Sequence, residues 1–99
     1  MIAKIHELNS MKIQMIFDGQ LFSTMSRSEA VESAITLLQD HRELLKGRDI
    51  MAQGDIPRCA LAVLAVLLRD LNARLYYFEE DEDTFVPIGM HCGPRYATL

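Results

Sequence analysis

The chain has 99 residues, of which 49% are apolar, and it carries ten Lys and Arg against fourteen Asp and Glu. This length and composition predict a single folded domain and exclude an intrinsically disordered chain. The net charge of −4 at pH 7 argues against direct binding to nucleic acids, because such binding relies on clustered basic residues. Two cysteines cannot build a disulfide framework, and the first residues hold no apolar export signal, so we expect a cytoplasmic protein.

The first 25 residues predict a β-hairpin. Residues 2–8 contain apolar side chains among polar neighbours, a pattern that fits a short strand or a helical turn equally well. Residues 11–17 alternate between apolar and polar, and Asp18-Gly19 separates them from a second β-prone run. We therefore expect strands at 11–17 and 20–25. A helix over 10–22 is the competing interpretation, and it would place Gly19 inside the helix.

Residues 27–46 predict the first long helix. Ser26 and Glu29 have the spacing of a capping box, in which side chain and backbone satisfy one another at a helix start. Apolar residues then recur at helical spacing from Val31 to Leu45. Lys46 and Gly47 are typical of a helix end. We expect the following segment, 47–54, to be a connection.

An uninterrupted apolar run extends from Cys59 to Leu68. Asp55 and Pro57 are typical of a helix start, so we expect a helix over 56–75. The run is too short for a membrane span, which takes about 20 apolar residues, and no membrane partner is expected. Because this helix is apolar on every side, it is either a central core helix or part of a subunit interface. The predicted homodimer interface consists of Ala62, Ala65, Val66 and Arg69.

The last third of the chain predicts a second hairpin. Its strands are expected at 75–78 and 85–88, with five successive carboxylates, 79–83, at the tip. Pro87 places the second strand at a sheet edge, and the tail, 90–99, is expected to be irregular. Together the elements predict an α+β fold with an N-terminal hairpin, two antiparallel helices and a C-terminal hairpin. The strands are expected to join in a small antiparallel sheet that the helices cover on one face.

The sequence contains no catalytic or phosphate-binding signature, and no cofactor is expected. The acidic run lacks the alternating ligands and the glycine of a calcium-binding loop. His91 and Cys92 could form a zinc site with Cys59 and either His6 or His41, but the short paired spacing of structural zinc ligands is missing. The two tail residues could also form a Cys–His nucleophile pair, although no oxyanion site accompanies them in the sequence.

These features predict a small acidic interaction or regulatory protein, an adaptor or inhibitor of the kind that mobile elements carry, and not an enzyme. We expect it to bind another protein, with the acidic loop as the polar contact and nearby aromatic side chains as anchors. The predicted contact residues are Tyr76, Tyr77, Glu79, Glu80, Asp81, Glu82, Asp83 and Phe85. Two alternatives remain open: a nucleic-acid-mimicking inhibitor that uses the 79–83 loop against a basic target, and an enzyme or metal site built on His91 and Cys92.

Overall fold

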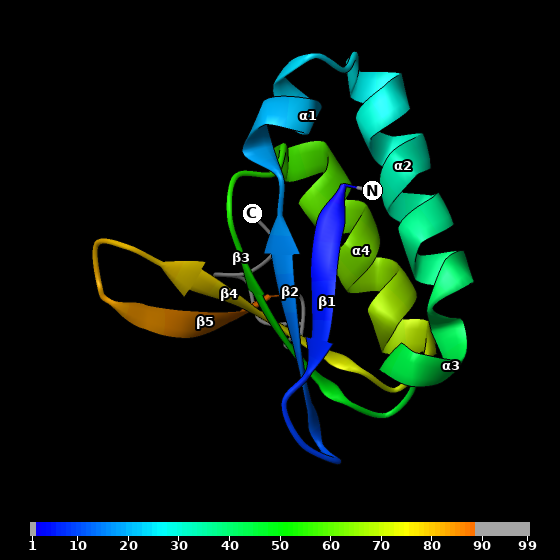
Figure 1. Ribbon diagram of the computed structural model, residues 1–99, viewed down its shortest axis with the longest axis vertical. Coiled ribbons are helices and arrows are strands. Elements are labelled where there is room, and N and C mark those ends of the chain that lie inside the picture. The colour runs from blue at the N-terminus through cyan, green and yellow to red at the C-terminus, as the bar shows by residue number, and fades with distance from the viewer. Residues whose placement is uncertain (1, 89–99) are drawn as a thin grey trace.

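Residues 2–88 are described by the structure, a computed structural model, and they alternate between strands and helices (Figure 1). The elements in chain order are β1 (Ala3–Glu7), β2 (Lys12–Phe17), α1 (Gly19–Ser23), α2 (Arg27–Asp40), α3 (Arg42–Leu45), β3 (Asp49–Gln53), α4 (Arg58–Asp70), β4 (Arg74–Glu79) and β5 (Thr84–Ile88). The strands form one sheet in the order β1-β2-β3-β4-β5. Helices α2 and α4 lie on the same face of this sheet, which confirms the predicted α+β class.

The sheet is mixed, which corrects the prediction of a wholly antiparallel sheet. The outer pairs β1–β2 and β4–β5 are antiparallel, whereas β2–β3 and β3–β4 are parallel. Two parallel neighbours need a crossover between them, and α2 and α4 are those two crossovers. Because each helix returns the chain to the start of the next parallel strand, α2 and α4 run parallel to one another and not antiparallel as predicted (Figure 1).

The N-terminal hairpin exists, but it lies earlier in the chain than predicted. Residues 3–7 are a strand that pairs with β2, and the turn between them is held by Asn9, whose Oδ1 accepts hydrogen bonds from the N–H groups of Met11 and Lys12. The prediction of a strand at 20–25 was wrong, because α1 occupies residues 19–23. Asp18 caps this helix by accepting bonds from the N–H groups of Gln20 and Leu21, so the Asp-Gly pair begins a helix here and not a hairpin turn.

Two further predictions, for residues 27–46 and 47–54, need correction. The helix expected over 27–46 is divided at His41 into α2 and the short α3, although its predicted capping box is present. The connection expected at 47–54 contains β3, the central strand of the sheet. This strand was missed because only Ile50 and Ala52 carry its buried side, and one of them is too small to give a clear alternating signal.

Helix α4 is shorter than the predicted 56–75. It begins after Pro57 without a side-chain cap, so Asp55 does not have the capping role expected of it. At the other end, Asn72 adopts a left-handed φ of 57°, and the N–H of Ala73 donates to the carbonyl oxygen of Leu68 at 2.9 Å. This arrangement closes the helix and turns the chain directly into β4.

The hydrophobic core lies between the sheet and the two long helices. Its largest fully buried side chains come from β2, β3, β4 and the helices: Ile13, Met15, Leu45, Ile50, Leu64, Leu68 and Leu75. Burying one such side chain contributes roughly 1.5–3 kcal/mol, so this layer supplies the main stabilisation of the fold. None of the helices within residues 2–88 has the length and apolar content needed to cross a bilayer.

Candidate functional site

The face of the sheet opposite α2 and α4 carries apolar and aromatic side chains of the described strands. Strand side chains alternate between faces, and the buried members of β2, β3 and β4 all point toward the helices. The other face, which we call the open face, includes one row that crosses all five strands through paired residues: His6, Gln14, Met51, Tyr76 and Pro87. Apolar and aromatic side chains on this face are thus not covered by the long helices.

Aromatic residues concentrate at the β4–β5 end of the open face. Phe78 and Phe85 are directly paired across the two strands, with ring centroids 5.2 Å apart and an interplanar angle of 65°. Tyr76 lies on the same face one row further along β4. All three are half-buried, so each ring keeps part of its surface available for contact. Edge-to-face pairs of this kind fix ring orientation, which makes the cluster a preformed aromatic surface.

The predicted C-terminal hairpin is confirmed, and its acidic tip stands at the end of this aromatic cluster. Residues 79–83 are all exposed, and the N–H of Asp83 donates to the carbonyl oxygen of Glu80 at 3.2 Å to form the turn. Asp83 itself has a left-handed φ of 50°. Five carboxylates on one exposed turn create a strongly negative surface that attracts a cationic group.

Tyr77 does not share the surface of the other predicted contact residues. It pairs with the buried Ala52 and lies on the helix side of the sheet, where its hydroxyl donates to the carbonyl oxygen of Gly54. Burial raises the pKa of the Tyr77 hydroxyl, and the negative charges of Asp55, Glu79 and Glu80 raise it further. Phe78, which is not among the predicted contact residues, takes its place on the open face. The alternation along β4 contained this signal, because Phe78 stands two residues from Tyr76.

A hollow of about 560 Å³ adjoins the hairpin at the carboxyl end of the parallel strands. Asp55 and Tyr77 line it together with Glu79, Glu80 and Asp81, and Phe78 connects it to the open face. In open sheets with helical crossovers, the loops that follow the carboxyl ends of parallel strands are the usual place for binding sites. The predominance of carboxylates in this hollow favours a positively charged group such as a Lys or Arg side chain.

The predicted dimer residues of α4 lie on two different sides of the helix. Ala62 and Val66 are exposed, with half of Val66 accessible, whereas Ala65 is only 9% exposed and belongs to the core. Arg69 is exposed near the end of the helix and borders a hollow beside β4 and β5 together with Ala65. An apolar outward face therefore exists on α4, but its centre is Ala62 and Val66 and does not include Ala65.

The residues considered for metal binding or nucleophilic catalysis come from separate elements. His6 is on β1, His41 lies between α2 and α3, and Cys59 is on α4. Within residues 2–88, no cluster of three or more His, Cys, Asp or Glu side chains is arranged to hold a metal ion. His91 and Cys92, and the whole predicted irregular tail, lie outside the described residues.

Comparison with protein-family models, with curated proteins and with solved structures finds no match to this chain.

Proposed function

We propose that this protein is a small, non-enzymatic interaction protein that binds a basic surface of another protein through the β4–β5 end of its open face. The observation that carries this proposal is the position of the Tyr76, Phe78 and Phe85 cluster directly beside the acidic turn 79–83. Aromatic side chains supply much of the binding energy at protein interfaces, and surrounding charges determine the choice and approach of the partner. In this role the protein acts as an adaptor or inhibitor in the cytoplasm.

The distribution of charge favours one concentrated contact over mimicry of a nucleic acid. A mimic needs carboxylates spread along a surface at the spacing of phosphates, whereas the densest group here is on one turn and around the adjoining hollow. A Lys or Arg of the partner would enter this hollow between Asp55 and Glu80, and apolar groups of the partner would lie on Phe78 and Phe85. Homodimerisation through Ala62 and Val66 of α4 is a separate part of the proposal, because both residues are exposed and neither belongs to the open face.

The test of the proposal is affinity capture with immobilised full-length protein from extracts of the cells that produce it. Two variants remove the two halves of the surface: a triple variant, Glu80→Ser, Asp81→Ser and Glu82→Ser, and a double variant, Tyr76→Ser and Phe78→Ser. Glu43→Ser is the matched control, because Glu43 is an exposed carboxylate on α3, far from the hairpin.

Wild type and the Glu43→Ser control should retain the same partner, and both surface variants should lose it. Raising the salt concentration should also release the partner from wild type, because exposed charge pairs are screened. A partner retained equally by all four proteins would show that the open face is not the binding surface. Enzymatic turnover of a small molecule by the purified protein would contradict the non-enzymatic role.

A further inference from the structure

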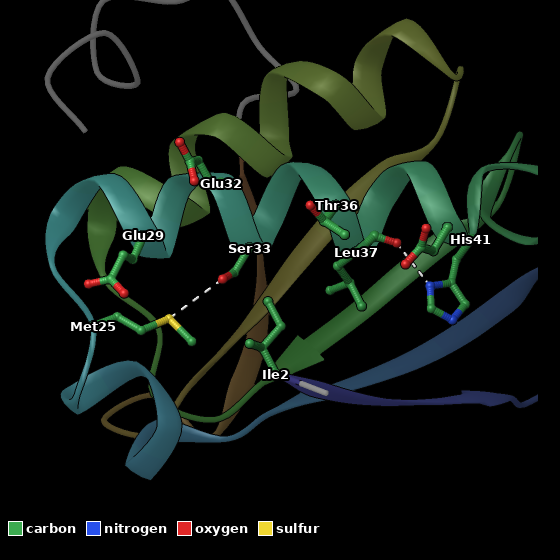
Figure 2. A pocket seen from close by; sticks show the side chains of 9 residues that line it. Ile2, Met25, Glu29, Glu32, Ser33, Thr36, Leu37 and His41 are labelled. Carbon is green, nitrogen blue, oxygen red and sulfur yellow. Dashed lines mark hydrogen bonds between the residues drawn. The ribbon is translucent and has the colours of Figure 1, made fainter.

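A groove lies between α2 and the start of the first strand (Figure 2). Strand β1 forms the opposite edge of the sheet from the β4–β5 hairpin (Figure 1). The groove has a volume of about 540 Å³, and helix α2 forms one wall along most of its length. The floor is apolar: Ile2 and Leu37 are almost fully buried, and Met25 is half-buried beside them. The Ser33 hydroxyl donates to the Met25 sulfur at 3.6 Å, which holds that flexible side chain at one end of the floor (Figure 2).

Strand β1 presents hydrogen-bonding groups beside this groove that no other strand within residues 2–88 uses. It is the first strand in the sheet order, so no strand within residues 2–88 lies beyond it. The N–H of Asp18 donates to Ile2, and the N–H of Leu8 donates to Lys12. Because antiparallel partners alternate between bonded and non-bonded pairs, the even-numbered residues of β1 bond to β2. The odd-numbered residues Ala3, Ile5 and Glu7 therefore direct their N–H and C=O groups outward.

The two edges of the sheet differ as templates for an added strand. Edge strand β5 contains Pro87, which has no N–H to donate, whereas β1 contains no proline. Side chains of Ala3 and Ile5 point to the same side of the sheet as the groove, because they pair with the buried Phe17 and Met15. An extended peptide that bonds to β1 would consequently place every second side chain over the groove.

The charge along the groove specifies which side chains fit. Glu29 and Glu32 stand toward one end of α2 and Asp40 toward the other, and all three are exposed. No Lys or Arg is among the described residues that line the groove. The backbone and side chain of Ser26 lower the pKa of Glu29, so this carboxylate keeps its charge in mildly acidic solution. The groove thus offers an apolar centre between two acidic ends.

We propose that β1 and the α2 groove bind an extended peptide segment of another protein. The segment contains an apolar residue, with one Lys or Arg two positions before it and another two positions after it. The segment adds to the sheet as a sixth strand antiparallel to β1, with its apolar residue opposite Ile5, so that the N–H of that residue donates to the outward C=O of Ile5. Its apolar side chain contacts Ile2 and Leu37, and its basic side chains reach Glu32 and Asp40. This site is separate from the open face and the acidic hairpin, and it does not depend on the function proposed for them.

The test uses a synthetic peptide with the core Lys-Thr-Val-Thr-Lys, blocked at both ends, and isotope-labelled full-length protein. Peptide binding is followed by amide chemical shifts and by hydrogen exchange. The amides of Ala3, Ile5 and Glu7 should become protected, whereas those of Lys4 and His6 should change little, because they already bond to β2. A second peptide that carries N-methylvaline in the centre lacks the N–H that faces β1, and it should bind about tenfold more weakly or worse.

Two protein variants with the same net charge distinguish binding in the groove from a general attraction between the acidic protein and the basic peptide. The variant Glu32→Lys with Asp40→Lys should weaken peptide binding about tenfold, because both basic side chains then meet like charge. The control Glu43→Lys with Asp70→Lys changes the net charge equally at two exposed carboxylates outside the groove and the hairpin, and it should weaken binding roughly twofold or less. The triple hairpin variant of the preceding section should bind the peptide like wild type.

Four results would overturn the inference. The first is absence of binding at millimolar peptide, and the second is equal affinity for the N-methylated peptide. The third is loss of binding in the hairpin variant with retention in the groove variant, which would move the basic peptide to the acidic tip. If the β1 amides are already protected without peptide and light scattering gives twice the chain mass, a second copy occupies this edge and the peptide site is wrong.

Discussion

The hydroxyl of Tyr77 donates a hydrogen bond to the backbone carbonyl of Gly54. This bond joins β4 to the loop between β3 and α4, and it directs Tyr77 away from the open face. Tyr76 and Phe78 point to the other side of the same strand. The consecutive aromatic residues 76–78 therefore have two roles: one closes the carboxyl end of the sheet, and the other two contribute to the proposed contact surface.

The first prediction concerns the Tyr77 hydroxyl. Tyr77→Phe should reduce the free energy of unfolding at pH 7 by about 1 kcal/mol, the usual net value of one such hydrogen bond. Because the pKa of Tyr77 is raised in the fold, the folded state favours the neutral hydroxyl. That contribution is complete below the ordinary tyrosine pKa, near 10, and is lost as the pH rises through the folded pKa. Between pH 7 and 11, the free energy of unfolding measured with denaturant should decline less in Tyr77→Phe than in wild type. If it declines equally in both proteins, the Tyr77 hydroxyl does not have this role.

The second prediction compares two glycines with left-handed backbones. Gly54 has a φ of +97°, and an added Cβ would lie 2.4 Å from the carbonyl oxygen of Phe17. Gly47 has a φ of +72°, but no atom lies within 4 Å of the corresponding position. Gly47→Ala should cost about 1–2 kcal/mol from backbone strain alone. Gly54→Ala should lower the free energy of unfolding clearly more, because the added Cβ would also push the β3–α4 loop away from Phe17 of β2. Equal losses in urea unfolding would show that the close approach to Phe17 is not maintained in solution.

The third prediction concerns the capping box of α2. The N–H of Glu29 donates to the Ser26 hydroxyl at 3.2 Å, and a Glu29 carboxylate oxygen accepts from the Ser26 N–H at 2.9 Å. Ser26→Ala should therefore lower the unfolding free energy by about 1 kcal/mol. Ser28→Ala, a substitution at an exposed serine in the first turn, is the control and should have little effect.

The same cap also predicts a pH dependence. The pKa of Glu29 is lowered by its bonds to Ser26, so the stabilisation is present above the ordinary glutamate pKa and is lost as the pH falls through the folded value. Thermal unfolding of wild type and Glu29→Gln between pH 7 and 2 should therefore converge in acid. A difference that grows toward low pH would contradict this sign.

The fourth prediction tests self-association through α4. Val66→Glu places a charge on the exposed apolar face and should convert the proposed dimer to monomers that remain folded, as measured by light scattering and circular dichroism. Ala65→Glu should instead destabilise each subunit, because Ala65 is packed in the core. A wild-type protein that already has the mass of one chain at micromolar concentration would rule out the dimer.

Local signals in the sequence predicted those elements whose stability depends on nearby residues. The Ser26–Glu29 cap led to α2, and the two β-prone runs on either side of the acidic residues 79–83 led to the β4–β5 hairpin; both are present in the structure. The strand β3 could not be recognised because its position depends on parallel pairing with β2 and β4, and Ala52 carries little pattern. Asp18-Gly19 misled the prediction for a related reason, since the same dipeptide suits a hairpin turn and a helix cap.

The candidate sites divide in the same way. The acidic run and its aromatic neighbours were visible in the sequence, and the predicted strand at 75–78 was enough to separate Tyr77 from Tyr76, because side chains alternate along a strand. Only the identity of the face that the helices cover required the topology of the sheet. The groove beside α2 was not predicted at all. Its lining brings together Ile2 and Leu37, which are far apart in the sequence. Ile2 immediately precedes the strand at residues 3–7, a segment that the sequence left undecided between strand and helix.

The affinity of the captured partner for purified wild-type protein and for the triple hairpin variant, measured at low and high salt, tests the central claim most directly. Binding through the acidic turn predicts a dissociation constant at least about tenfold weaker in the variant at low salt, with the two proteins converging near 1 M salt, where charges are screened within about 3 Å. The same dissociation constant for both proteins at every salt concentration would contradict the proposed binding surface.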